Sequence, residues 1–266
     1  MPSREGQNAP PMSALDLVEQ EAGPLYHVAS RICRNRDEAE ELVQEVFVEA
    51  LRSWEGFRGE STPATWLFRI AARHCRKMHR KRSGEPEAVA SLDELLPCGE
   101  ARVAQIGGEA DEQVQAVLFT EAVQRVEAEL AALDVSFRMP LLLKDVVGLS
   151  VAEIAEVLEM EVDTVRSRVH GARMKLRDAV DEGLPPRPSV PPPTPYSRQT
   201  CLDLLNAKQA AMDRGVAFDS TIICERCQVV FDTLDLTQQA CRALSQNELP
   251  PGLREALRER VRSETT

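Results

Sequence analysis

The stretch LLLKDVVGLSVAEIAEVLEMEVDTVRSRVHGARMKLR, residues 141–177, decides the fold of this chain. Ser150 and, three residues later, Glu153 have the spacing of a helix capping box. A short turn over residues 159–162 then leads to Asp163, the expected cap of a second helix. Apolar residues recur along both helices at helical spacing, which predicts a helix-turn-helix.

The second helix of this pattern is cationic on its outer and flanking surfaces. A helix, a tight turn and a cationic second helix form the geometry that places a helix in the major groove of DNA. Arginines there either hold phosphates or pair with guanine, and both roles stay open. An ordinary helical hairpin is the alternative. The residues predicted to face DNA are Thr164, Arg166, Ser167, Arg168, His170 and Lys175.

A second basic segment ends an earlier predicted helix, residues 64–82. Seven of its last fourteen residues are Arg or Lys, and none is acidic. Cations suit a helix C-terminus, but this number exceeds what the helix dipole needs. Interleaved flat side chains are what unstacked bases require. The residues predicted to contact nucleic acid here are Trp66, Arg69, Arg73, Arg76, Lys77 and Arg80.

The composition favours helices packed on helices. The chain has 266 residues, of which 43% are hydrophobic and only 4% aromatic, and its net charge is −11. An acidic chain does not coat nucleic acid generally, so the contact with phosphate has to be local. No run of eighteen apolar residues and no signal-peptide core occurs, so we expect a cytoplasmic protein without a membrane partner. Because no triad, Walker or glycine-rich phosphate signature is present, we do not expect an enzyme.

Shifts in composition divide the chain into units. We expect an all-α protein in which two small helical domains are joined by a flexible acidic linker and followed by a small helical, Cys-rich domain. The expected divisions are a disordered tail at 1–12, a first domain at 13–82, the acidic linker at 83–112, the helix-turn-helix domain at 113–181, a proline-rich linker at 182–197 and the Cys-rich domain at 198–266.

The predicted helix 36–54 has an acidic ridge beside its apolar face. Asp37 is placed to cap it. Glu38, Glu41, Glu45 and Glu49 gather within about 80° of one another at 100° per residue. This ridge either docks on a basic partner or is an ordinary solvated face.

These segments also resemble a known family. The stretches 37–47, 57–60 and 65–71 look like the second conserved region of extracytoplasmic-function (ECF) sigma factors, and the stretches 148–150, 153–155 and 162–170 resemble that family's fourth region. The resemblance covers roughly residues 13–180. Glu159 and Glu161 stand in the turn where the family commonly has glycine and proline. These positions are outside the predicted core, so the fold should survive the difference.

The resemblance implies partners and roles. It implies that the chain binds RNA polymerase core, through the β′ clamp and the β flap, together with promoter DNA. The clamp-facing residues would be Asp37, Glu38, Glu41, Leu42, Gln44, Glu45 and Phe47. A flipped base of the minus-ten element would be captured by the loop that holds Phe57, Arg58 and Ser61. The helix-turn-helix would read the minus-thirty-five element. A conventional helix-turn-helix regulator without sigma activity is the alternative.

Four of the seven cysteines lie in the last unit, and two of them form a CxxC motif. They are Cys201, Cys224, Cys227 and Cys241. No histidine follows His170, so we expect one zinc ion held by these four cysteines, or by three of them and another ligand such as Asp219, although thiolates also favour Cu(I) and Cd(II). A redox-active dithiol and buried core cysteines are the alternatives. The segment also looks distantly like zinc-binding anti-sigma domains, with Ser220 where those usually carry histidine.

This tail is predicted to regulate the rest of the chain. Tethered by the proline spacer, it could pack between the two DNA-binding units and mask the polymerase-facing helix until its metal or redox state changes. A separate regulatory protein and a purely stabilising appendage are the alternatives.

Overall fold

The computed structural model describes residues 13–33, 35–57, 59–80, 112–185, 194–244 and 249–264. Within these ranges all regular structure is helical, which confirms the all-α prediction. The N-terminal tail and nearly all of the acidic linker lie outside the described residues, so the predictions made for them stay predictions. In the part of the chain that is described, no helix has the length and apolar character needed to cross a bilayer.

The first unit consists of α1 (Ala14–Ile32), α2 (Arg36–Ser53), the 3-10 turn η1 (Trp54–Gly56) and α3 (Pro63–Arg80). Ser13 and Asp16 form a capping box at the start of α1. The cap of α2 is Asn35, whose side chain accepts a hydrogen bond from the backbone N–H of Glu38, so the prediction that Asp37 caps this helix was wrong. Asn and Asp are equally good caps, and the helix begins two residues earlier than Asp37 would require.

The second unit consists of α4 (Glu112–Ala132), α5 (Val135–Leu141), the π-helical turn η2 (Leu142–Val147), α6 (Val151–Leu158) and α7 (Val162–Gly183). The Ser150–Glu153 capping box predicted for α6 is present. The N-cap of α7 is Glu161, which makes no side-chain capping bond, so the prediction of Asp163 as the cap was wrong.

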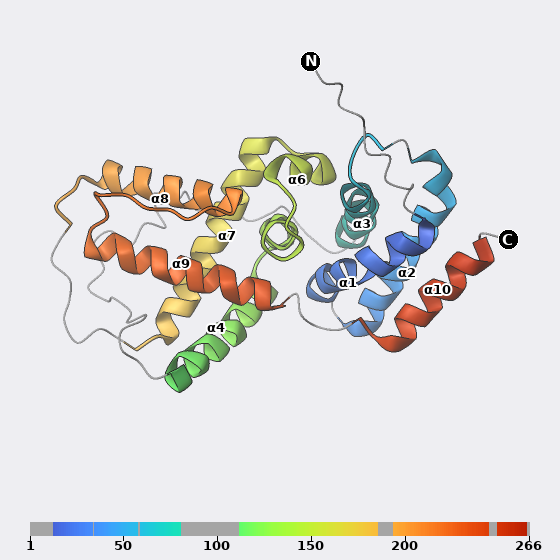
Figure 1. Cartoon of the computed structure of the whole chain (residues 1–266), viewed down its shortest axis with the longest axis horizontal. Helices are drawn as coiled ribbons and strands as arrows, with labels where there is room; N and C mark the ends of the chain where they lie inside the picture. Colours follow the sequence, from blue (N-terminus) through green and yellow to red (C-terminus); the bar gives the residue numbers. More distant parts are fainter. Residues whose placement is uncertain are drawn as a thin grey trace, which may run out of the picture.

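The C-terminal segment divides between the two units (Figure 1). Its helices are α8 (Arg198–Arg214), α9 (Glu225–Ala243) and α10 (Pro251–Glu264). Helix α9 packs on α4 and α7, whereas α10 packs on α1 and α2 at the other end of the molecule. Residues 198–264 therefore do not build one separate domain. They pack on both helical units.

Helices α8 and α9 run in the same direction, because the chain crosses back between them over residues 215–224 (Figure 1). A small apolar cluster lies beneath the pair. It includes Leu204 and Met212 of α8, Phe231 and Leu234 of α9, and Met174 of α7. The α8–α9 pair thus shares its apolar core with the helix-turn-helix unit.

The two units are in direct contact with each other. Arg138 donates from Nη1 to the backbone oxygen of Arg31 at 2.7 Å, and Arg31 donates from Nη2 to the backbone oxygen of Leu244 at 2.8 Å. One continuous cluster of buried apolar residues extends through both units and includes Leu253 and Leu257 of α10. The described residues therefore form a closed arrangement rather than two separated domains.

Candidate nucleic-acid interface

An aromatic cluster and a small hollow lie at the start of α3. The ring centroids of Trp54 and Phe57 are 5.3 Å apart in a stacked arrangement, and Trp66 lies 5.4 Å from Phe57. The hollow has a volume of about 230 Å³. Its lining is Gly56, Phe57, Glu60, Ser61, Trp66 and Arg69. Aromatic faces beside a guanidinium are what an unstacked base needs, and Phe57, Ser61, Trp66 and Arg69 were all predicted from the sequence to contact DNA.

The cations of α3 point in different directions. Arg69 and Arg76 face α6, where they pair with glutamates. Arg73 lies 3.9 Å from a carboxylate oxygen of Glu49 on α2, and Lys77 is exposed. Arg58 and the side chain of Arg80 lie outside the described residues. Three of the cations predicted to contact nucleic acid therefore lie beside carboxylates of the same chain.

The N-terminal half of α7 holds four of the residues that the sequence analysis predicts to face DNA. Thr164, Arg166 and Ser167 are exposed, and Arg166 pairs with Asp163 one turn earlier. Arg168 is half-buried and donates to the backbone oxygen of Ser136 at 3.3 Å. This is the part of a recognition helix that reaches base edges in a helix-turn-helix.

The C-terminal half of α7 is covered by α8 and α9. His170 was predicted to face DNA, but it is buried, and its Nε2 lies 3.0 Å from a carboxylate oxygen of Asp213. Lys175 was also predicted to face DNA, but it is half-buried with Nζ 5.6 Å from the ring centroid of Phe137. Both predictions were wrong for this arrangement, because α8 packs over His170 and the side chain of Lys175 lies against Phe137 of α5, and neither contact is visible in the sequence pattern.

The centre of this covered surface is a buried arginine. Arg173 is 1% exposed. Its guanidinium donates to both carboxylate oxygens of Asp145, at 2.8 and 2.7 Å, and to Asp213 at 2.7 Å. Gln209 and Gln238 complete the group, with Gln238 donating to Asp145 at 2.9 Å. Although burial opposes its charge, the two carboxylates raise the pKa of Arg173.

The sequence analysis missed this group. Position 173 lies on the flank of the predicted inward face, where a cation looks like part of the DNA-binding surface. Asp145 could have been noticed in the sequence, because it is the only acidic residue in the mainly apolar run 141–147. Asp213, forty residues away from Arg173 in sequence, carried none.

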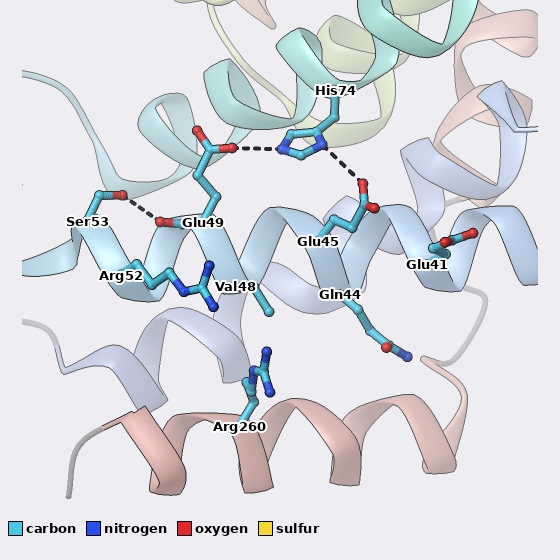
Figure 2. Close-up of a pocket in the computed structure, with 9 residues that line it drawn as sticks. All are labelled: Glu41, Gln44, Glu45, Val48, Glu49, Arg52, Ser53, His74 and Arg260. Carbon is cyan, nitrogen blue, oxygen red and sulfur yellow. Dashed lines mark hydrogen bonds and ion pairs between the residues drawn. The ribbon is translucent and has the colours of Figure 1, made fainter.

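The acidic ridge of α2 remains largely open (Figure 2). His74 lies between two of its members, 3.2 Å from Glu45 and 2.8 Å from Glu49. Asp37, Glu41 and Gln44 are exposed, and Glu38 is half-buried. Leu42 and Phe47 are at most 2% exposed, so their prediction as clamp-facing residues was wrong. They lie on the apolar face that holds α2 in its own core.

Helix α10 borders this ridge. A hollow of about 720 Å³ lies between α2, α3 and α10, and Gln44, Val48 and Arg52 line it on α2, opposite Arg260 of α10 (Figure 2). Glu19 of α1 pairs with Arg258 at 2.6 Å and with Arg254 at 3.5 Å. These contacts hold α10 beside the ridge without covering it.

Three of the four predicted metal-binding cysteines come together. The thiol of Cys227 is hydrogen-bonded to those of Cys224 and Cys201, and Thr194 Oγ1 lies 3.6 Å from Cys201 Sγ and 3.7 Å from Cys224 Sγ. Burial raises the pKa of Cys227, and the neighbouring Cys224 thiol adds to the rise. Burial also opposes the thiolate of Cys224, but hydrogen bonds from the backbone N–H of Cys227 and from Thr194 lower its pKa.

Cys241 does not join this cluster. It lies on the same helix as Cys227, fourteen positions further on, which at about 1.5 Å per residue is roughly 21 Å away. The predicted set of four cysteine ligands around one ion was therefore wrong in its fourth member. Cys241 is buried, and burial raises the pKa of its thiol. Among the residues described, no three His, Cys, Asp or Glu side chains are arranged as a ready-made metal centre.

Comparisons with known proteins match both units. The family description "Sigma-70 region 2" matches residues 17–85, and "Sigma-70, region 4" matches residues 124–176. The ECF RNA polymerase sigma-E factor of Escherichia coli (strain K12) is 32% identical over 166 residues, which are 60% of this chain and 82% of that relative. This chain belongs to the ECF RNA polymerase sigma factors.

Other sigma factors are similar to it. SigE of Mycolicibacterium smegmatis, an ECF RNA polymerase sigma factor, is 34% identical over 164 residues, which are 61% of this chain and 60% of that relative. The sigma factor RpoE of Bartonella quintana, solved in complex with the anti-sigma factor NepR, is 23% identical with a TM-score of 0.40 and covers 60% of this chain and 91% of that one. Sigma factors are transcription initiation factors rather than enzymes, in agreement with the sequence analysis.

The contact of Asp213 with Arg173 predicts an acid-sensitive stability of this sigma factor. Burial opposes the charge, but the hydrogen bond of His170 and the charge of Arg173 lower the pKa of Asp213 from its ordinary value. The stabilisation is thus complete above the unfolded pKa of about 3.9 and is lost as pH falls through the folded pKa. Asp213→Asn should lower the free energy of unfolding by about 3 kcal/mol at pH 7.

Urea denaturation at a series of pH values measures this effect. The difference between Asp213→Asn and the parent chain should shrink below about pH 4. Asp203→Asn is the control, because Asp203 is exposed on the same helix and should change the stability by less than about 0.5 kcal/mol. Equal losses for the two variants would contradict a stabilising role for the buried ion pair.

Proposed function

We propose that this chain directs core RNA polymerase to promoters and that its C-terminal segment controls this activity. The observation that carries the first part is the aromatic-lined hollow beside the cations of α3. Phe57 and Trp66 supply flat faces, and Arg69 supplies charge at the rim. A hollow of this kind suits a base taken out of the stack, as strand separation at a promoter requires.

The remaining surfaces would complete the task. The exposed side chains at the start of α7, Thr164, Arg166 and Ser167, would read duplex DNA in the major groove. The acidic ridge of α2 would dock on the β′ clamp, with Glu41 and Glu45 exposed on it. Charge on this ridge would chiefly set the rate and specificity of docking.

The described arrangement corresponds to an inactive state. Minus-ten and minus-thirty-five elements are about 25 base pairs apart, which is roughly 85 Å of duplex at about 3.4 Å per base pair. In the structure α3 and α6 touch, with Arg69 3.0 Å from Glu156. One chain in this arrangement cannot engage both elements. The two units would have to separate before promoter binding.

The C-terminal segment is suited to hold this state. Helix α9 contacts the helix-turn-helix unit, α10 contacts the first unit, and the chain between them joins the two. Asp213 and Gln238 of this segment contribute to the buried group around Arg173 on the recognition helix. Because the contacts are intramolecular, their effective concentration is high and they need not be individually strong.

The sigma activity predicts a complex with core polymerase. The purified chain, with its C-terminal segment released by the truncation described below, should co-elute with core enzyme in gel filtration. Together they should transcribe a template selected from promoter libraries. A chain that binds duplex DNA alone and never joins the core enzyme would be a conventional regulator instead.

If the C-terminal segment inhibits the chain, removal of the segment should increase transcription. Truncation after Pro185 keeps α7 intact and removes α8, α9 and α10. We expect at least a fivefold rise in transcription in vitro at equal concentrations of core enzyme, because loss of the intramolecular contacts removes a cost of roughly 1 kcal/mol or more. If the truncated chain is folded by circular dichroism and transcribes no better than the whole chain, the segment only stabilises the protein.

We further propose that Cys201, Cys224 and Cys227 hold one thiophilic metal ion, with zinc as the first expectation. The thiol of Cys227 interacts with those of Cys201 and Cys224, and the lowered pKa of Cys224 favours the thiolate that a metal requires. A bound ion would fix the starts of α8 and α9 to each other. Cu(I) and Cd(II) also suit a thiolate set.

A redox switch is the second candidate. Cys224 occupies the N-cap position of α9, and a thiol with a lowered pKa at a helix N-terminus is reactive. Attack on an oxidant such as hydrogen peroxide would form a sulfenic acid on Cys224, and the thiol of Cys227 would then displace water from it to form a disulfide.

Metal analysis separates the two candidates. The chain purified under reducing conditions should contain about one zinc ion per molecule, and Cys227→Ser should lose most of it, because a site with two thiolates binds far more weakly. Cys241→Ser should retain the metal, since Cys241 lies at the other end of α9. A metal-free parent chain that forms the Cys224–Cys227 disulfide with peroxide would favour the redox switch.

A further inference from the structure

Three glutamates of the helix-turn-helix unit lie along α3 of the first unit. We call Glu153, Glu156 and Glu159 the α6 acidic row. Glu153 accepts a hydrogen bond from Thr65 at 3.1 Å, and Glu156 pairs with Arg69 at 3.0 Å. The partners on α3 are Thr65, Arg69 and Arg76, which fall within about 40° of one another on the helix. The row therefore follows one face of α3.

The third contact of the row is bidentate. The two guanidinium nitrogens of Arg76 lie 3.1 and 3.2 Å from the two carboxylate oxygens of Glu159. Arg76 also donates to the backbone oxygen of Leu158 at 3.3 Å. A planar guanidinium binds a phosphate in the same two-point way. Glu159 thus occupies Arg76 much as a DNA phosphate would.

Glu159 adopts an unusual backbone conformation. It ends α6 with φ 54° and ψ 50°, and it is the only residue other than glycine with a positive φ among those described. A side chain in this region costs free energy that glycine would not. The turn between α6 and α7 therefore carries a cost at the residue whose side chain reaches Arg76.

We propose that the α6 acidic row is an intramolecular latch that occupies the phosphate-binding face of α3. This proposal rests on the proposed DNA-binding role of α3. The α6 acidic row and DNA compete for Arg69 and Arg76. The closed state therefore binds single-stranded DNA more weakly. Because the latch consists of exposed ion pairs, salt weakens it as well as the DNA contacts.

Two measurements on the full chain test the latch. The double variant Glu156→Gln/Glu159→Gln removes two charges of the row. Glu159→Gly removes the contact of Glu159 with Arg76 and also the free-energy cost of a positive φ at a residue other than glycine. Binding of a fluorescent, mixed-sequence single-stranded DNA 12-mer at about 50 mM salt should strengthen three- to tenfold for the double variant. Small-angle scattering should give a larger radius of gyration.

Matched controls separate the latch from net charge. Glu161→Gln/Glu259→Gln removes the same charge from two exposed glutamates that lie outside the row. Equal gains for this control and the row variant would overturn the proposal. An unchanged radius of gyration in the row variant would also overturn the proposal, because a latch has to hold the two units together as well as compete with DNA.

A charge exchange tests the contact without any DNA. Arg76→Glu and Glu159→Arg should each enlarge the chain in scattering experiments, and the two together should restore the compact form. Failure of the pair to restore it would overturn the latch. Failure of the truncated chain to join core polymerase would instead overturn the proposed sigma activity and leave the scattering result standing.

Discussion

The buried guanidinium of Arg173 is the interaction on which the packing of the C-terminal segment against the helix-turn-helix unit depends. A charge with 1% exposure is tolerable only when its partners are close and well oriented. Asp145 comes from the π-helical turn η2, and Asp213 comes from α8. One side chain of the recognition helix thereby fixes the unit that carries it and the segment that covers it. Loss of either carboxylate leaves the arginine buried with too few acceptors.

Much of the fold could be predicted from local chemistry. The capping box at Ser150 and the apolar spacing after it predicted α6, because both signals lie within a few residues of the element they define. The caps predicted for α2 and α7 each lie two residues after the observed caps. At both places several acceptors stand in succession, and only the path of the incoming chain decides which one is used.

The candidate site was predictable in part for the same reason. A run of cations without acids on α3 is visible in sequence, and so are the aromatic residues around the hollow. The pairing of Arg69 with Glu156, which are 87 positions apart, is not visible. Leu42 and Phe47 were misassigned because the family resemblance was applied to residues that helical spacing had already placed on the apolar face. Cys241 failed as a ligand because α9 runs unbroken between it and the CxxC motif.

The parallel course of α8 and α9 gives the C-terminal segment the properties of a lever. The thiol cluster lies where both helices begin, and the side chains that reach Arg173 and Asp145 lie near where they end. Over a rigid arm of roughly 20 Å, a tilt of about 10° moves the far end by about 3.5 Å. That displacement exceeds the range over which a hydrogen bond survives. A small change of angle at the sulfur atoms would therefore disturb the hydrogen bonds that Asp213 and Gln238 make at the far ends of α8 and α9.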